Sequence, residues 1–258
     1  MSQSPAPDAD RTAPLGGKAA LITGAARRVG AAIAQALHGA GANVVLHYRS
    51  SAEQALALAR QLNGIRPGSA TTAACDLLDC AALAALAQTA ADAFGGLDIL
   101  VNNASSFYPT PLGSIGEAQW DDLIGTNLKA PLFLAQAAAG ALRERRGLIV
   151  NLADIHGLRP LRRHPVYCVA KAGLIMLTKS LARELGPQVR VNAIAPGPVM
   201  WPESGVDAHL REEIVARTAL KRTGSAADVA RALLFFACEA PFVTGQVLAV
   251  DGGRSIGW

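Results

Sequence analysis

The sequence predicts an α/β protein in which helices cover both faces of a doubly wound parallel sheet of about seven strands. Two observations favour this class. Short apolar runs alternate with Ala-rich stretches of helical length along the chain. Hydrophobic residues make up 51% of the 258 residues and charged residues only 17%, which suits a sheet that is buried under helices on both sides.

The first strand–helix–strand unit follows the polar N-terminus. A short apolar strand ends in a turn at Thr23 and Gly24, an Ala-rich helix extends to about Gly39, and a second strand covers residues 43–47. Further strands are expected at residues 70–75, 97–101, 148–152, 189–194 and 246–250, with helices between them. Parallel strands that are joined by helices need right-handed crossovers, so each helix is expected to return over a face of the sheet.

The chain shows no shift in composition, long linker or internal repeat. We therefore expect one domain at residues 17–258, after a flexible tail at residues 1–16. The tail lacks the apolar segment of a signal peptide, and no apolar run reaches the roughly 18 residues that span a bilayer. Residues 197–224 begin rich in Pro and Gly and continue as an amphipathic stretch, which we interpret as a lid over the substrate.

Cysteine spacing and net charge narrow the class of partner. The four cysteines show no CxxC or Cys/His ligand spacing, so we interpret them as buried thiols in a reducing compartment and expect no metal site. The net charge is +4, but no basic stretch is interleaved with aromatic residues, which argues against nucleic acid. These features predict a cytoplasmic protein that binds a small anionic ligand and no membrane.

The stretch TGAARRVG, residues 23–30, lies where the first strand meets the first helix. Gly24 allows a tight turn, Gly30 allows close packing of the helix, and the helix N-terminus favours a dinucleotide pyrophosphate. Together they indicate a Rossmann-type site. Two glycines alone also fit an ordinary helix start.

The second strand ends in HYRSS, residues 47–51, without the Asp or Glu that would bind the adenosine ribose of NAD. The Arg49 guanidinium, the hydroxyls that follow it and Arg28 in the turn could instead bind a 2′-phosphate, so we expect NADPH rather than NADH. The alternative is a solvated Arg in a polar loop. After the third strand, Asp76 either accepts a hydrogen bond from adenine or caps the next helix.

Six motifs occur in one order along the chain: the Gly turn, NNA at residues 102–104, Asn127 in GTNLKAP, YCVAK at residues 167–171, the Pro196-Gly197 pair and a final DGG. This set resembles the short-chain dehydrogenase/reductase family over residues 18–253. The resemblance implies catalytic roles for Asn127, Tyr167 and Lys171, and a homotetramer in which the long helices expected at residues 117–142 and 164–185 pack between subunits.

Two departures from the general family pattern are informative. Most members carry Ser thirteen residues before the Tyr, where this chain has Asp154, and they carry Gly where this chain has Arg28. Both departures, with NNASSFYPTP and LHYRSS, resemble the pteridine reductase branch, which reduces pterins with NADPH. That resemblance implies that Asp154 replaces the Ser, that Arg28 reaches the pyrophosphate and the pterin, and that Ser105 and Phe107 also contact the pterin.

The residue types fit reduction of a C=N bond. Tyr167 and Lys171 are four residues apart on one helix face, so we expect the ammonium to lower the pKa of the phenol and to hold the nicotinamide ribose. An ionised Asp154 would repel a carbonyl oxyanion, but it could share a proton with Tyr167 for delivery to a ring nitrogen. Alone, such an Asp is more often a cap or turn former and such a Phe is more often part of the core. We interpret His156 and His164 as loop residues.

The prediction is therefore an enzyme that reduces dihydropterins to tetrahydropterins with NADPH, with oxidised pterins and dihydrofolate as further candidate substrates. The alternatives are a short-chain reductase of ketones and, more remotely, a non-catalytic NADPH-binding regulator. The predicted catalytic residues are Asp154, Tyr167, Lys171 and Asn127, and the predicted pterin contacts are Arg28, Ser105, Phe107, Asp154 and Tyr167. The predicted cofactor residues are Gly24, Arg28, Val29, His47, Tyr48, Arg49, Ser50, Asp76, Leu77, Asn103, Ala104, Ser105, Tyr167, Lys171, Pro196 and Gly197.

Overall fold

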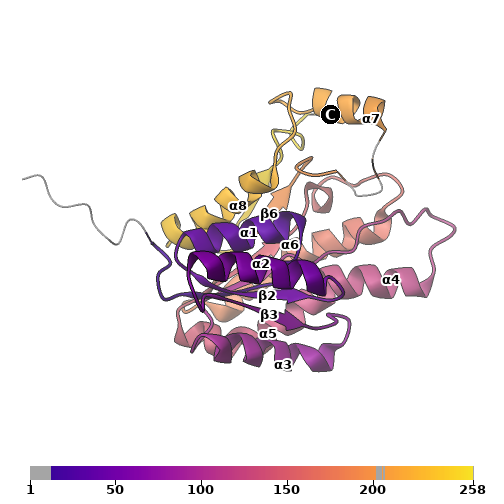
Figure 1. Ribbon diagram of the computed structural model, residues 1–258. Helices are drawn as coiled ribbons and strands as arrows, with labels where there is room; N and C mark the ends of the chain where they lie inside the picture. Colours follow the sequence, from indigo (N-terminus) through magenta and orange to yellow (C-terminus); the bar gives the residue numbers. More distant parts are fainter. Residues whose placement is uncertain (1–12, 202–204, 206, 258) are drawn as a thin grey trace, which may run out of the picture.

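A parallel sheet of seven strands forms the centre of the computed structural model, which describes residues 13–201, 205 and 207–257 (Figure 1). The strands lie in the order β3-β2-β1-β4-β5-β6-β7, and every neighbouring pair is parallel. This arrangement confirms the predicted doubly wound α/β fold. The strands are β1 Ala19–Ile22, β2 Asn43–Tyr48, β3 Ala70–Ala74, β4 Ile99–Asn102, β5 Leu148–Leu152, β6 Arg190–Pro196 and β7 Val247–Val250.

Helices cover both faces of this sheet. Helices α1, α2 and α8 contribute to the core on one face, and α3, α5 and α6 contribute to the core on the other (Figure 1). The helical elements are α1 Arg28–Gly39, α2 Ala52–Ile65, α3 Cys80–Ala93, α4 Glu117–Ile124, η2 Gly125–Lys129, α5 Ala130–Glu144, η3 Ile155–Gly157, α6 Pro165–Leu185, α7 Ala208–Ala216, α8 Ala226–Leu234 and η4 Phe235–Glu239. Among these described helices, not one combines the length and the hydropathy that a bilayer span requires.

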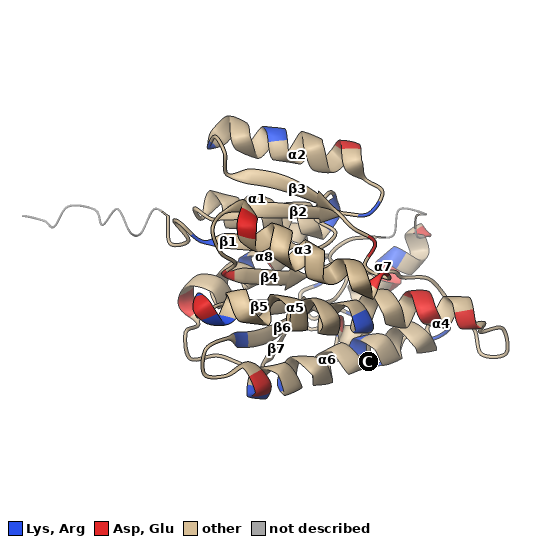
Figure 2. Ribbon diagram, turned by 90° about the horizontal axis from the view of Figure 1, so that it is seen from below, with Lys and Arg blue, Asp and Glu red and all other residues tan. Residues whose placement is uncertain are grey.

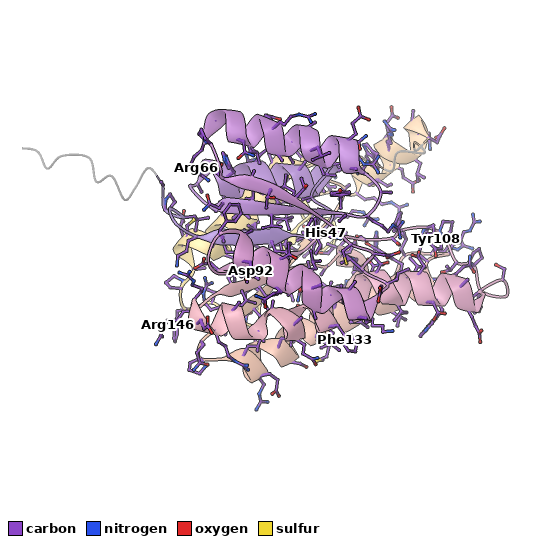
Figure 3. All side chains as sticks on the ribbon, turned by 60° about the horizontal axis from the view of Figure 1, so that its bottom comes forward. His47, Arg66, Asp92, Tyr108, Phe133 and Arg146 are labelled. Atoms are coloured by element: carbon purple, nitrogen blue, oxygen red, sulfur yellow. The ribbon has the colours of Figure 1, made fainter. Side chains whose placement is uncertain are left out.

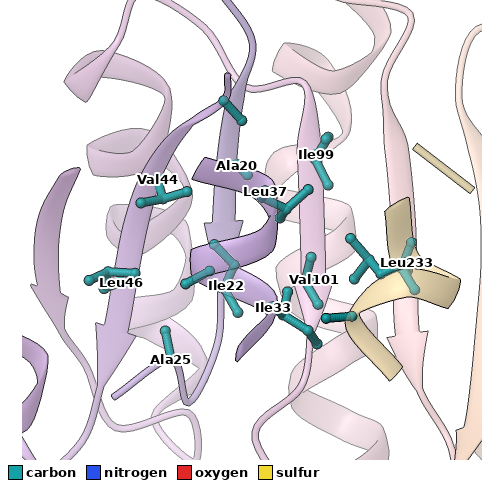
Figure 4. Close-up of a cluster of buried hydrophobic side chains, with 14 of the residues drawn as sticks. Ala20, Ile22, Ala25, Ile33, Leu37, Val44, Leu46, Ile99, Val101 and Leu233 are labelled. Atoms are coloured by element: carbon teal, nitrogen blue, oxygen red, sulfur yellow. The ribbon is translucent and has the colours of Figure 1, made fainter. Parts of the chain in front are cut away.

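The central strands are apolar because both of their faces are covered. Ile22 of β1 and Leu46 of β2 belong to the core under α1 and α8, whereas their neighbours Leu21 and Val45 belong to the core under α3 and α5. Successive side chains of a strand alternate between faces, so each strand needs an unbroken apolar run. Figure 4 shows the first of these cores, and in Figure 2 the central strands carry no charged residue.

The predicted strand ends differ from the observed ends by at most two residues. The helix expected at residues 117–142 is a larger departure, because it is three elements: α4, the π-helical segment η2 and α5. The wider turn of η2 contains Asn127, one of the predicted catalytic residues. π-helical turns inside α-helices occur frequently at functional sites.

The predicted tail and the predicted thiols also need correction. Leu15 falls within the predicted tail, yet it is buried in the core, and its N–H donates to the Ala40 carbonyl at 2.8 Å. The folded region therefore begins before residue 17; residues 1–12 of the tail lie outside the described residues. All four cysteines are free, but only Cys168 is buried, and the other three are partly exposed.

A chain of buried hydrogen bonds connects β4, β5 and α6. The Asn102 amide donates to Asn151 Oδ1 at 2.8 Å, and the Asn151 amide donates to Thr178 Oγ1 at 2.9 Å. The Thr178 hydroxyl in turn donates to the Leu174 carbonyl at 2.8 Å. Each of these polar side chains is buried, so each needs its partner. This series of hydrogen bonds fixes the position of α6 relative to the ends of β4 and β5.

We expect Asn151→Ala to lower the free energy of unfolding by about 1–3 kcal/mol for each polar group that it leaves unsatisfied. Urea unfolding followed by circular dichroism measures the change. Gln88→Ala is the control, because Gln88 is an exposed amide on α3 that bonds only to exposed Asp92, and its effect should stay within about 0.5 kcal/mol. An Asn151→Ala midpoint equal to that of the wild type would contradict a structural role for this chain.

Candidate active site

The turn between β1 and α1 is so tightly packed that two of its positions accept only glycine. Gly24 has a φ of +62°, and a Cβ at Gly24 would lie 3.1 Å from the Ala104 backbone. A Cβ at Gly30 would lie 2.2 Å from the Gly24 carbonyl oxygen. The sequence-based assignment of these two glycines to a tight turn and a close helix approach is confirmed by this geometry.

A cavity of about 390 Å³ opens beside this turn at the carboxyl ends of the strands. Twelve of the predicted cofactor residues line it: Gly24, Arg28, Val29, His47, Tyr48, Arg49, Ser50, Asp76, Leu77, Asn103, Ala104 and Ser105. The lining also includes Ser51, whose hydroxyl the sequence analysis assigned to the 2′-phosphate, and residues that the sequence analysis did not select, such as Ser106 and Thr126. Tyr167, Lys171, Pro196 and Gly197 lie outside this lining. The residues needed to hold a dinucleotide phosphate therefore converge at one place.

His47 is buried and holds the turn. A peptide N–H can only donate, so Nδ1 accepts from the Gly24 N–H at 3.1 Å, and Nε2 donates to the Cys75 carbonyl at 3.0 Å (Figure 3 labels His47). Burial lowers the pKa of His47, with smaller opposing effects of the Cys75 carbonyl and Asp76. The imidazole is thus a neutral link between β1, β2 and β3 at the wall of the cavity.

Thr23 is a structural residue that the sequence reasoning missed. Its Oγ1 accepts from the Asn103 N–H at 2.9 Å and from the Ala104 N–H at 3.0 Å. The Asn103 side chain returns a bond to the Thr23 carbonyl at 2.8 Å. These bonds tie the loop after β4 to the turn after β1. The Asp76 carboxylate accepts from the Leu78 N–H at 3.0 Å. The alternative that Asp76 caps the next helix is wrong, because the N-cap of α3 is Asp79.

Asp154 and Tyr167 are joined at the end of β5. The Tyr167 hydroxyl donates to Asp154 Oδ2 at 2.8 Å. The other carboxylate oxygen accepts from the His156 N–H at 2.7 Å and caps the short helix η3. One side chain therefore both pairs with Tyr167 and caps η3, because each oxygen has a different partner. The role of Asp154 in proton transfer stays a prediction.

The prediction that Lys171 lowers the pKa of Tyr167 is wrong. Burial raises the pKa of Tyr167 well above 10, and the charge and hydrogen bond of Asp154 raise it further, against a smaller effect of Ser105. The Lys171 ammonium donates to the Leu152 carbonyl at 2.8 Å and lies over the Tyr167 ring, 5.6 Å from its centroid. Burial lowers the pKa of Lys171 to about 8, and Asp154 opposes that shift.

Asn127 holds the loop that follows β4. The Ser105 hydroxyl donates to Asn127 Oδ1 at 2.6 Å, and the Asn127 amide donates to the carbonyls of Ser106 and Leu123, both at 2.9 Å. Asn127 is fully buried. Its described partners thus lie in the loop and in α4, and through Ser105 it lies beside the hydroxyl of Tyr167, whose pKa Ser105 affects.

Phe107 is exposed at the mouth of the site. Its side chain is 44% exposed, so the alternative of a core residue is wrong. The ring stacks on His164 with centroids 4.8 Å apart and planes 9° apart, and it meets the Tyr167 ring edge to face at 4.8 Å. His164 was interpreted as a loop residue only. His164 is the N-cap residue of α6 and lies three residues before Tyr167. Residues three apart at a helix start lie near each other, and this spacing could have indicated that His164 lies beside the site.

Arg28 links the turn to the predicted lid. Its φ of +56° lies in the left-handed region, and its guanidinium donates to the Trp201 carbonyl at 2.8 Å. The segment predicted as a lid contains α7, and residues 202–204 and 206 of that segment lie outside the described residues. The role of the segment as a lid stays a prediction. At the start of this segment, a Cβ on Gly197 would lie 2.6 Å from Asp251 Cβ, so this glycine permits close packing against the final DGG.

No group of three or more metal-ligand side chains occurs in the described part of the chain.

Comparisons with known proteins agree with this architecture. A family model described as enoyl-(acyl carrier protein) reductase matches residues 24–255. Pteridine reductase 1 of Leishmania tarentolae is 37% identical, over 95% of this chain and 97% of its own. A 3-oxoacyl-(acyl-carrier-protein) reductase FabG of Staphylococcus aureus is 36% identical, over 92% of this chain and 97% of its own.

A solved structure is also similar over nearly the whole chain. It is the crystal structure of a blue fluorescent protein from a metagenomic library in complex with NADPH, with a TM-score of 0.88 and 32% identity, over 93% of this chain and 98% of that one. These names refer to different substrates, whereas the sequence identities to this chain are nearly equal. The comparisons therefore define a family rather than a substrate. With a family model over most of its length and relatives above 30% identity, the chain belongs to the short-chain dehydrogenase/reductase family of oxidoreductases.

Proposed function

We propose that this protein is an NADPH-dependent pteridine reductase that reduces dihydropterins. The observation that carries the proposal is the 2.8 Å hydrogen bond from Tyr167 to Asp154, a carboxylate at the position where most of the family has a neutral hydroxyl. The similarity to a pteridine reductase supports it, but a 3-oxoacyl reductase is similar to nearly the same extent. A short-chain ketone reductase is therefore the second candidate.

The cofactor part of the proposal rests on the fit of the cavity. Both glycines of the turn lie in the cavity lining and add no side chain to it, and the exposed Arg49 lies in the same lining with Ser50 and Ser51. These groups suit the 2′-phosphate of NADPH, because an Arg forms charge-assisted hydrogen bonds to phosphate oxygens. A related chain was solved in complex with NADPH. NADPH, when bound, supplies a hydride.

The residues around Tyr167 then handle the proton. Reduction of a C=N bond leaves a ring nitrogen that needs a proton, whereas reduction of a ketone leaves an oxyanion that a nearby carboxylate would repel. The raised pKa of Tyr167 keeps its hydroxyl protonated at neutral pH, so it can donate. Asp154 holds and orients that proton, and its partly exposed carboxylate gives a route for reprotonation from water. The Lys171 ammonium offsets the negative charge of Asp154 within the same site.

NADPH should exceed NADH in kcat/KM by at least about tenfold, which corresponds to roughly 1.4 kcal/mol. The physical reason is the Arg49 guanidinium beside the cavity and the absence of an acidic residue at the end of β2. Initial rates at 340 nm with dihydrobiopterin measure the ratio. Arg49→Ala should bring the two cofactors close to parity, whereas Arg60→Ala, an exposed Arg of α2, should leave the ratio as it is. Equal use of both cofactors by the wild type would disprove the assignment.

Asp154→Ser should lower turnover of dihydrobiopterin by about 10² or more, the usual scale for the loss of one acid–base group. NADPH affinity should persist. The wild-type rate should fall on the alkaline side as Lys171, with a pKa of about 8, loses its charge. Asp154 raises the pKa of both Lys171 and Tyr167, so its removal should move that alkaline limb to lower pH.

Steady-state rates of both proteins between pH 6 and 10 test this expectation. The same variant assayed with a β-ketoacyl thioester separates the two candidate functions, since Ser restores the hydroxyl that favours an oxyanion. Unchanged pterin turnover with an unmoved alkaline limb would refute the role of Asp154. Thioester reduction by the wild type without pterin reduction would favour the ketone reductase.

We also propose a homotetramer. Large apolar side chains are exposed on the helices that the family resemblance assigns to subunit packing: Trp120 on α4, Phe133 on α5 and Val169 and Met176 on α6. Exposed apolar patches of this kind mark interaction sites.

Light scattering after size exclusion should therefore give about four times the 26.6 kDa mass of one chain. Met176→Glu should lower that mass, because it places a charge in the proposed interface. Ile65→Glu should not, because Ile65 is exposed at the end of α2 on the other face of the sheet. A wild-type mass of one chain would contradict the tetramer.

A further inference from the structure

One carboxylate binds both neighbours of Phe107. The Ser106 hydroxyl donates to Asp122 Oδ1 at 3.2 Å, and the Tyr108 hydroxyl donates to Asp122 Oδ2 at 2.9 Å (Figure 3 labels Tyr108). Asp122 lies on α4, fourteen residues after Tyr108, and belongs to none of the sequence motifs. The residue between the two donors, Phe107, instead contacts His164 and Tyr167.

The Asp122 carboxylate holds the loop at two places, because each of its oxygens accepts from a different hydroxyl. The bond from Tyr108 is the shorter of the two. The Tyr108 ring packs against buried Leu123 and Val166. Burial and the Asp122 carboxylate raise the pKa of Tyr108 to about 12, so its hydroxyl remains a donor across the range of an enzyme assay.

The helix that carries Asp122 is itself held at its start. The Gly116 N–H donates to Gln119 Oε1 at 3.0 Å, so the Gln119 side chain reaches back to the N-cap residue of α4. At its other end Asn127 holds Ser105 and the Ser106 carbonyl. The loop from Ser105 to Tyr108 is therefore bound along its length to the frame formed by α4 and η2, and only the Phe107 ring is left to face the mouth of the site.

We infer that Asp122 is a positioning residue that sets where the Phe107 ring stands relative to Tyr167, and thereby sets the affinity for a flat aromatic substrate. The inference rests on the proposed function in so far as Phe107 contacts that substrate. Asp122 itself does not line the cofactor cavity; it acts through Tyr108 and through Ser106, and Ser106 does line that cavity.

Asp122→Asn tests this inference, because it keeps the shape of the side chain and removes the charge and one acceptor. We expect KM for dihydrobiopterin to rise about three- to tenfold, the scale of losing an aromatic stacking contact, while kcat stays within about twofold. The Kd of NADPH, measured by fluorescence, should change by less than this KM, because Ser106 is the only one of the two bonded residues that lines the cofactor cavity. Asp121→Asn is the matched control, since Asp121 is exposed and adjacent on the same helix, and it should behave as the wild type.

A double-mutant cycle identifies the route of the effect. If Asp122 acts through Phe107, then Asp122→Asn should add less than about twofold to KM in a Phe107→Ala background. Full multiplication of the two effects would overturn the inference, as would a loss of NADPH affinity equal to the loss of pterin affinity. Tyr108→Phe removes one of the two bonds without altering Asp122, and it should reproduce part of the effect should Asp122→Asn fold poorly.

Amide hydrogen exchange gives a test that is independent of the substrate. With NADPH present, the amides of residues 104–112 should exchange faster in Asp122→Asn than in the wild type, while β4 and β5 remain protected. Unchanged exchange in that segment, or faster exchange throughout the protein, would overturn the inference. If the wild type reduces no pterin, the proposed substrate fails, and the exchange result still decides whether Asp122 positions the loop.

Discussion

The order of the parallel strands determines where the ligand-binding crevice of this protein lies. The chain winds outward from β1 through β2 to β3 and then returns to place β4 on the other side of β1. Loops that leave β1 and β4 therefore diverge to opposite faces of the sheet, and a crevice opens between them at the carboxyl ends. The tight glycine turn forms one wall and the loop after β4 forms the other. Thr23 bridges the two walls with hydrogen bonds to the Asn103 and Ala104 amides.

The chemical end of the crevice is governed by burial. Tyr167 and Lys171 are both almost fully buried, and Asp154 lies beside them, so three ionisable groups share one poorly solvated region. Burial disfavours the charged forms of Tyr167 and Lys171, so it raises the pKa of the phenol and lowers the pKa of the ammonium. A carboxylate is tolerated there because two donors bind it and a cation lies near. That combination is the basis of the proposed transfer of a proton to a ring nitrogen.

The loop after β4 obtains its shape from elsewhere in the chain. Its residues form no regular structure, and their hydroxyl and carbonyl groups bind to Asp122 and Asn127 on one continuous helical element. The π-helical turn at η2 widens that element where Asn127 enters the interior. A loop held in this way can present an exposed aromatic ring without the ring being packed into a core. The rigidity of the site thus comes from α4 and η2 as much as from the sheet.

Several features were determined by the sequence alone, because they depend on neighbours in the chain. The alternation of apolar strands and Ala-rich helices predicted the fold, the two glycines predicted the turn, and the resemblance of the motifs to the family predicted the pairing of Asp154 with Tyr167. Other features depend on residues brought together from distant segments. The direction of the Tyr167 pKa shift followed from burial, and the position of Lys171 over the ring followed from its bond to the Leu152 carbonyl. The stack of His164 on Phe107 and the hydrogen bonds from Ser106 and Tyr108 to Asp122 were likewise decided only by the tertiary structure. These contacts join residues that are far apart in the sequence, and only the folded chain brings them together.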